Sequence, residues 1–283
     1  MKVSTFNAKT RKKKFVNADE INAIKVAYGK PLERKDYLRY GLIPGLIVGG
    51  FSFILLYLWW VSLILGIIGA LYGLKVLMPK IIQRTYEQVS FRERNKFVNN
   101  MTQILTNDSQ TLLKALGRAS DRSEGELKMD LKVLQAKLMG ADHGQVLQAF
   151  KVISNKYRDD IIFVQYIEQI ETASLEGKTN MDTLKDIKSY HNEMKEKKEE
   201  YDRKKDGHLK DIKSLCIIVV FFILIIAFSF NFETYINAFA RHPIGWCTAG
   251  IYMLLMFFFS RSFANYYFDD SIMEVKYEDS SNY

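Results

Sequence analysis

Residues 40–74 read YGLIPGLIVGGFSFILLYLWWVSLILGIIGALYGL, without one charged side chain. A helix that crosses a membrane needs roughly 20 mostly apolar residues. This stretch therefore accommodates two spans joined by a tight turn, which we place near Trp59, Trp60 and Val61. Residues 214–232 and 243–260 are also uncharged, and each provides one further span. The sequence predicts a polytopic membrane protein with two transmembrane hairpins.

The distribution of Lys and Arg predicts the orientation of these spans. Residues 1–39 contain 11 Lys and Arg against 4 Asp and Glu, whereas residues 231–242 contain one Arg and one Glu. Basic residues beside spans are retained in the cytoplasm, so we expect both termini to be cytoplasmic. The net charge of +8 lies mostly in this N-terminal segment. The orientation of the spans and attraction to anionic lipid explain this excess of positive charge. We therefore expect no nucleic-acid partner.

The long polar segment between the two hairpins has the pattern of an all-α bundle. Its apolar side chains recur every three or four residues, which is typical of amphipathic helices. Asp142 with Gln145 and Ser123 with Glu126 have the spacing of capping boxes, and Gly140 and Gly177 can end helices. Five apolar stripes follow one another: Phe97, Met101 and Ile104; Leu112, Leu113 and Leu116; Leu127, Leu131, Leu134 and Leu138; Val146, Phe150 and Ile153; Phe163, Ile167 and Ile170.

A long helix is expected to link this bundle to the third span. From residue 181 onward, apolar side chains and His191 recur at helical spacing, and no proline interrupts the chain before the span. Gly207 is the weak point of this helix, because glycine costs about 1 kcal/mol relative to alanine in a helix interior.

The chain therefore divides into five expected parts. These are a basic cytoplasmic N-terminal segment (1–40), a transmembrane hairpin (41–78), a cytoplasmic helical domain (79–213), a second transmembrane hairpin (214–260) and a cytoplasmic tail (261–283).

No pattern of catalytic or metal-binding residues is found. The sequence lacks a phosphate-binding Gly-Lys-Ser/Thr loop, a Gly-x-Ser-x-Gly elbow, His-Glu-x-x-His and Cys-x-x-Cys. The adjacent acids Asp159–Asp160 and Glu199–Glu200 point to different helix faces, so we interpret them as solvated charges. We expect no enzyme activity, no metal and no cofactor.

Small residues in the spans suggest close helix packing. Four-residue spacing of small side chains lets two helix backbones approach closely. Such pairs pack either within a hairpin or between subunits. They are Gly45 with Gly49, Gly69 with Gly73, and Gly245 with Ala249.

The cytoplasmic segment also carries a series of motifs that resembles a known family. Ala115-Leu116 follows a turn, and the glycine turn at residues 140–144 precedes Leu147 and Ala149. The stretch ETASLEG at residues 171–177 then precedes Met181, Leu184 and the long basic helix. In topology and motifs the chain resembles the type II secretion F-domain family, the inner-membrane platform proteins of type II secretion and type IV pilus machines. It is most similar to the single-domain branch of tight-adherence pili. It departs from the family at Asn107-Asp108-Ser109, where the family usually has glycine.

The resemblance implies a six-helix cytoplasmic domain and a non-enzymatic function in the bacterial plasma (inner) membrane. Such a platform contacts a hexameric cytoplasmic secretion ATPase and pilin-like subunits, and it associates with itself or with a second platform paralogue. Exposed turns of the domain are the candidate partner contacts, although they are equally well explained as ordinary helix ends. The candidate residues are Gly140, Asp142, Gly144, Glu171, Glu176 and Gly177.

Two other function classes fit parts of the sequence. A scaffold component of a conjugative type IV secretion channel would share the charge pattern without the paired-helix domain. A membrane sensor would share the long helix, but the short outer loop at residues 231–242 argues against it.

Overall fold

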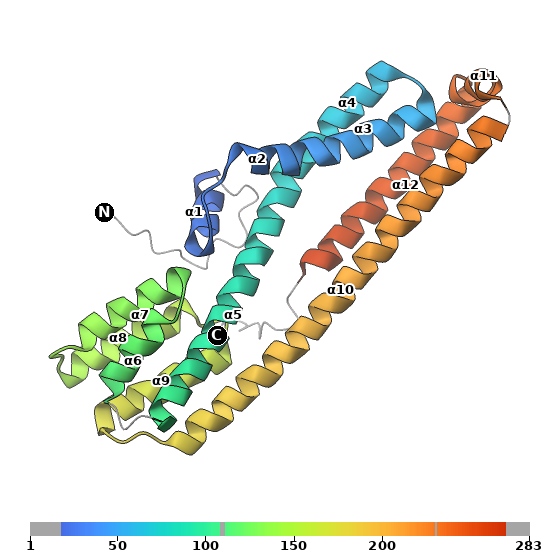
Figure 1. The fold of residues 1–283 in the computed structure, drawn as a ribbon. Coiled ribbons are helices and arrows are strands. Elements are labelled where there is room, and N and C mark those ends of the chain that lie inside the picture. The colour runs from blue at the N-terminus through green and yellow to red at the C-terminus, as the bar shows by residue number, and fades with distance from the viewer. Residues whose placement is uncertain (1–17, 108–110, 230, 270–283) are drawn as a thin grey trace, which may run out of the picture. The chain divides into compact units, whose positions relative to one another are not determined.

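The computed structural model describes residues 18–107, 111–229 and 231–269, and these residues form helices and no strand (Figure 1). The all-α prediction is confirmed for this part of the chain. Residues 1–17 of the basic N-terminal segment, Asp108, Ser109 and the tail after Asp269, for which the sequence made predictions, lie outside it. Four helical stretches are long and apolar enough to cross a membrane: Arg34–Leu56, Trp59–Thr106, Met181–Ser229 and Pro243–Phe268.

The chain separates into two compact units, Met1–Tyr86 with Ala227–Leu254, and Glu87–Ile226 with Leu255–Tyr283. In the first unit, α3 and α4 pack along each other. Helical structure is continuous from α2 to α3 and from α4 to α5. The elements that begin in this unit are α1 (Ala18–Tyr28), α2 (Arg34–Tyr37), η2 (Leu38–Leu42), α3 (Ile43–Leu56), α4 (Trp59–Tyr72), η3 (Gly73–Leu77), α5 (Met78–Asn107), α11 (Phe232–Tyr235), η4 (Ile236–Ala240) and α12 (Pro243–Phe268).

The turn between the first two spans lies slightly earlier than the sequence suggested. Tyr57 adopts a left-handed conformation with φ 53°, and its N–H donates to the Phe53 carbonyl, which ends α3. Leu58 is extended, and Trp59 already begins α4. The two tryptophans are therefore in the first turn of α4 rather than in the connection, because the chain reverses through a single left-handed residue.

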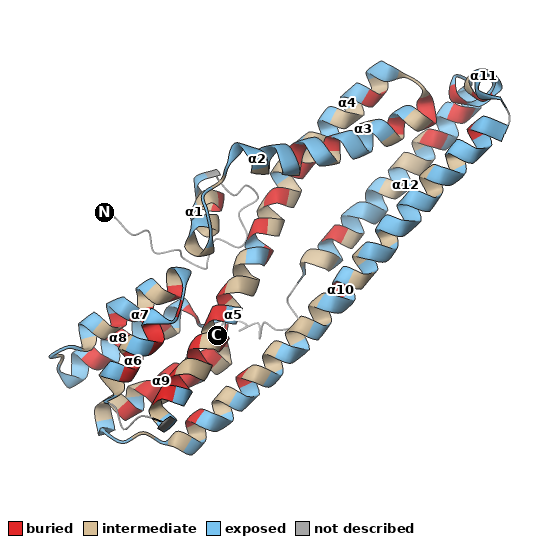
Figure 2. Ribbon diagram, in the orientation of Figure 1, coloured by how far each residue is buried: buried red, intermediate tan, exposed pale blue. Residues whose placement is uncertain are grey.

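The second unit contains a bundle of six helices around one apolar core (Figure 2). It comprises the second part of α5, then α6 (Leu112–Asp121), α7 (Gly125–Leu138), α8 (His143–Lys156), α9 (Ile161–Glu176) and the first part of α10 (Met181–Ser229). Members of all five predicted stripes lie in the core or against it, including Phe97, Leu131, Phe150 and Ile167. The helical periodicity of the sequence therefore identified the buried faces correctly.

Three of the predicted helix ends are confirmed and one is wrong. Gly140 directly follows Met139, the C-cap of α7, and adopts the left-handed conformation with φ 71°. The Asp142 side chain accepts a hydrogen bond from the Gln145 N–H, which completes the capping box of α8, and Gly177 ends α9 with φ 67°. Ser123 does not cap α7. Its hydroxyl is buried and donates to the Ala119 carbonyl at 2.9 Å, so Glu124 takes the N-cap position instead.

The long helix expected from residue 181 is present. α10 contains 49 residues without a break, and at 1.5 Å per residue its axis is about 70 Å long. Gly207 lies within it, and a methyl group added there would meet no other atom within 4 Å.

Candidate functional site

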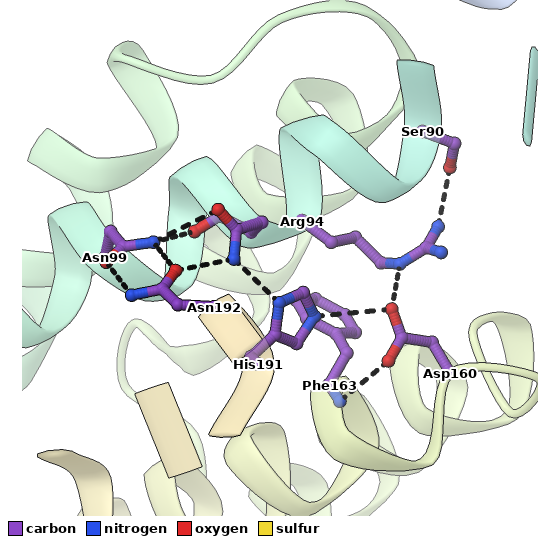
Figure 3. Close-up of polar contacts among 8 residues, drawn as sticks. Ser90, Arg94, Asn99, Asp160, Phe163, His191 and Asn192 are labelled. Carbon is purple, nitrogen blue, oxygen red and sulfur yellow. Dashed lines mark hydrogen bonds and ion pairs between the residues drawn. The ribbon is translucent and has the colours of Figure 1, made fainter. Parts of the chain in front are cut away.

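A cluster of buried and half-buried polar side chains joins three helices of the second unit (Figure 3). Its members come from α5, from the N-cap of α9 and from α10. We call this cluster the polar junction. It consists of Ser90, Arg94, Asn95, Asn99, Asp160, His191 and Asn192.

An ion pair between Arg94 and Asp160 forms one half of the polar junction. Arg94 Nε donates to Asp160 Oδ2 at 2.7 Å, and one terminal nitrogen donates to the Ser90 hydroxyl at 2.6 Å. The other carboxylate oxygen of Asp160 accepts from the Phe163 N–H at 3.1 Å. One carboxylate therefore caps α9 and fixes it to α5 at the same time.

The surroundings of Asp160 keep its carboxyl group ionised. Burial alone would raise the pKa of Asp160, because an apolar environment disfavours the charged form. The nearby ring N–H of His191 and the positive charge of Arg94 act in the opposite direction and outweigh burial, so the pKa lies well below the ordinary value. The guanidinium of Arg94 also lies over the rings of Tyr157 and Phe163, at 5.4 and 5.9 Å from their centroids.

His191 connects α10 to both of the other helices. Its side chain is fully buried and stacks on Phe91 with ring centroids 5.0 Å apart. Nδ1 lies 2.9 Å from the Asn95 amide nitrogen. Because an amide NH₂ only donates, Nδ1 is the acceptor and the ring proton is on Nε2. Nε2 faces Asp160 Oδ2 at 3.5 Å, which is longer than an ordinary hydrogen bond.

Asparagines extend the polar junction on the side of His191 away from Asp160. Asn192 Oδ1 accepts from the amide nitrogens of Asn95 and Asn99, each at 2.8 Å, and its own amide donates to Asn99 Oδ1 at 3.0 Å. These bonds run only between α5 and α10. They fix the rotation of α10 about its own axis, since a turn of either helix would break these bonds and leave the buried Asn95 amide without a partner.

The polar junction corrects one interpretation made from the sequence. Asp160 was interpreted as a solvated charge, but it is buried, whereas Asp159 beside it is exposed. A local signal existed, because Asp160 precedes the Phe163 stripe at the spacing of a helix N-cap. His191 also occupied an apolar position of the α10 stripe. That Arg94 reaches both residues depends on the tertiary fold, and spacing along the chain does not indicate it.

A second contact holds the end of α12 against α10. Lys205 is a charged residue with only 1% exposure. Its Nζ donates to the Asp269 carbonyl at 2.5 Å and lies 4.4 Å from the centroid of the Tyr201 ring. Next to it, the Tyr267 hydroxyl donates to Asp206 at 2.8 Å. We call these contacts the Lys205 clamp.

The candidate partner contacts lie at two turns of the bundle. Gly140, Asp142 and Gly144 are exposed in the turn between α7 and α8. Glu176 and Gly177 are exposed at the end of α9, and Glu171 is half-buried one turn earlier. Burial and, secondarily, the charge of Glu168 raise the pKa of Glu171. The two turns remain candidates, because no partner tests them.

The candidate packing residues in the spans differ in what surrounds them. A Cβ added to Gly45 would lie 2.9 Å from the Gly66 carbonyl oxygen, and one added to Gly49 would lie 3.2 Å from that of Ser62. Gly69 faces Val48 and Pro44, and Gly73 faces the Tyr40 carbonyl. These four glycines line the contact between the first two spans. Gly245 instead faces the Phe239 carbonyl in the preceding connection, and Ala249 is buried.

Metal-binding geometry is not found in the described part of the chain, where no three His, Cys, Asp or Glu side chains group closely enough to hold an ion. The side chains of the polar junction that could bind a metal are Asp160 and His191. Asp160 accepts from Arg94 and the Phe163 N–H, and His191 Nδ1 accepts from Asn95. The geometry of the polar junction is that of a connector between helices.

The fold defines a class of protein: across the described residues it is an all-helical protein with four helices able to cross a membrane. The chain belongs to the same family as the Bacillus anthracis protein pXO2-23, an uncharacterized protein. The two are 72% identical over 276 residues, which is 98% of this chain and the whole of the relative. No family model and no solved structure matches the chain.

Proposed function

We propose that this protein is a non-enzymatic platform in the bacterial inner membrane. Two transmembrane hairpins flank a cytoplasmic six-helix domain, and both termini are cytoplasmic. The platform couples a hexameric secretion ATPase in the cytoplasm to the extraction and assembly of pilin-like subunits. It acts as an oligomer, with itself or with a second platform paralogue.

The observation that carries this proposal is the continuity between bundle and spans. The first and last helices of the bundle, α5 and α10, are parts of the helical stretches Trp59–Thr106 and Met181–Ser229, each of which contains an apolar segment long enough for a span. Each of these two stretches is helical over its whole length. A displacement of the bundle is therefore transmitted along two continuous helices, as a protein that passes on mechanical work requires.

The polar junction supports the same proposal. A bundle that moves its own helices relative to one another would absorb an applied force. Arg94, Asp160 and His191 fix α5, α9 and α10 to each other with directional bonds. The Lys205 clamp adds α12 to α10. The partner-facing turns at residues 140–144 and 176–180 would then receive the force, and the helices of the bundle would move together.

A conjugative type IV secretion scaffold is the second candidate function. The name of the relative carries the plasmid designation pXO2, and a plasmid gene favours a function in plasmid transfer. The two candidates differ in phenotype. Deletion of a pilus platform abolishes pilin-like fibres and leaves transfer intact, whereas deletion of a transfer scaffold abolishes transfer and leaves fibres intact.

A proline in α10 tests force transmission. Glu196 is exposed and lies between the polar junction and the Lys205 clamp. Lys198 is less suitable, because its Nζ lies 4.8 Å from the Phe91 ring centroid. Glu196→Pro removes a helix hydrogen bond and introduces a kink at a cost of about 3 kcal/mol. We expect normal membrane insertion and retained co-purification of the ATPase, but loss of fibre assembly in the native host.

Two variants control this experiment. Glu196→Ala removes the same side chain without a kink and should assemble fibres normally. Gly207→Ala adds a methyl group into open space, strengthens α10 and should also leave assembly intact. Fibre assembly at the normal rate in an inserted Glu196→Pro protein would show that α10 is not a mechanical coupler.

A further inference from the structure

The first span carries an exposed stripe that changes from basic to apolar along one helix face. Leu38, Leu42 and Leu46 follow one another at four-residue spacing and are 58%, 52% and 65% exposed. Arg34, Lys35 and Arg39 lie on the same face, at the end where the apolar residues stop, and all three are exposed. The opposite face contains the buried Gly41 and Gly45, which contact the second span.

The basic end of this stripe is held in place by α1. Ile21 of α1 packs with Met78 and Ile82 of α5 in a buried cluster, against which Tyr40 also packs. The Leu32 N–H donates to Asn22 Oδ1 at 2.9 Å, which ties the connection between α1 and α2 to α1. Arg34, Lys35 and Arg39 therefore extend from a fixed backbone and not from a loose arm.

The charge of this surface is positive and open to a partner. Asp36, the acid within the basic group, points to α1 and forms an ion pair with Lys25. Within the described residues, Arg34, Lys35 and Arg39 form no ion pair of their own. One guanidinium group can donate two parallel hydrogen bonds to two phosphate oxygens, and the lysine ammonium adds a positive charge on a flexible side chain.

We propose that this face of α2, η2 and α3 is a binding site for an anionic phospholipid. The acyl chains lie along Leu38, Leu42 and Leu46, and the headgroup phosphate is bound by Arg39, Lys35 and Arg34. An anionic headgroup is favoured over a zwitterionic one, because three adjacent cations repel an ammonium group. The lipid site requires only that α3 lie in a bilayer, so it does not depend on the platform function.

Competition between two lipids tests the site. The full chain is purified in detergent, incubated with equimolar phosphatidylglycerol and phosphatidylcholine, and its bound lipids are counted by native mass spectrometry. Each basic residue near an anionic surface strengthens binding to anionic lipid by about five-fold. We therefore expect wild type to retain at least about five-fold more phosphatidylglycerol than phosphatidylcholine. The triple variant R34Q/K35Q/R39Q should reduce this ratio to near one.

Three controls make the result specific. R34K/K35R/R39K keeps the charge and should keep the preference. K114Q/K137Q/K151Q removes the same charge from exposed lysines of the bundle and should also keep it. Inorganic phosphate should not displace the bound phosphatidylglycerol, because it lacks acyl chains. An unchanged ratio in R34Q/K35Q/R39Q, an equal loss in K114Q/K137Q/K151Q, or displacement by phosphate would each overturn the lipid site.

Discussion

The contact between α3 and α4 and the polar junction of the bundle join helices by opposite means. In the first, glycines face backbone atoms of the neighbouring helix, as Gly45 faces the Gly66 carbonyl and Gly49 faces that of Ser62. In the second, large and charged side chains meet, with Arg94, Asp160 and His191 at the centre. The first contact brings glycines against backbone oxygens and a few small side-chain groups such as Val48 Cβ, whereas the second is made mainly of polar side-chain atoms.

Lipid outside the first contact and water outside the second would explain the difference. Lipid chains are as apolar as leucine, so spans gain little from burying apolar side chains and depend on close backbone contact. A bundle in water gains from the burial of Phe97, Leu131 and their neighbours. That gain can compensate for a desolvated ion pair, which then contributes directionality. The stability of the bundle should therefore be most sensitive to loss of charge, and the stability of the contact between α3 and α4 should be most sensitive to added volume.

The largest effect is expected from Asp160→Asn. The substitution leaves the half-buried Arg94 without its counter-charge and weakens the cap of α9. Breaking a buried ion pair by removing one partner costs about 3–5 kcal/mol. Denaturant unfolding of the full chain in micelles, followed by near-UV circular dichroism, measures the loss. Asp159→Asn is the matched control, because its side chain is exposed, and it should change the unfolding free energy by less than about 0.5 kcal/mol.

The pH dependence of the Asp160 contribution follows from its lowered pKa. A carboxyl group whose pKa is lower in the folded than in the unfolded state stabilises the protein above the unfolded value, and the stabilisation is lost as pH falls through the folded value. The stability difference between wild type and Asp160→Asn should therefore be constant from about pH 8 to about pH 5. A difference that disappears in this range would mean that the polar junction does not hold Asp160 ionised.

A smaller loss is expected when volume is added between the first two spans. A methyl group at Gly45 or Gly73 meets backbone oxygens that cannot move independently of their helix. Overpacking of this kind costs about 1–3 kcal/mol, measured as a lower melting temperature of the full chain in micelles. Gly50→Ala is the matched control in the same helix, because no atom lies within 4 Å of the added methyl group. Equal melting temperatures for all three variants would show that close backbone contact is not what joins α3 to α4.

The smallest effect is expected at the Lys205 clamp. Lys205→Met keeps the length of the side chain but removes the hydrogen bond to Asp269 and the contact with the Tyr201 ring. Together these contribute about 1–2 kcal/mol. The loss should be local, so hydrogen exchange of the backbone amides in residues 261–268 should become faster while the core of the bundle is unchanged. Lys204→Met, at an exposed position paired with Glu200, should leave the exchange rates as they are.

The sequence was informative wherever structure depends on local pattern. Apolar runs identified the four candidate spans, helical periodicity identified the buried residues of the bundle, and Asp142 and Gly177 marked helix ends correctly. The family resemblance and the orientation of the termini remain predictions. The sequence was misleading where a residue has two possible local roles, as at Ser123, whose hydroxyl bonds back to α6 instead of capping α7.

The sequence by itself thus determined that residues 18–107, 111–229 and 231–269 are largely helical, that they include four helices able to cross a membrane, and which faces of the bundle helices are buried. Apolar runs and helical periodicity are properties of the local sequence. Only the tertiary structure decided that Arg94, Asp160 and His191 meet. Asp160 lies 66 residues from Arg94 along the chain, and nothing in the local pattern of either residue specifies the other. Their contact is set by how α5, α9 and α10 pack around the apolar core, and once the core forms, desolvation makes the pairing of these charges necessary.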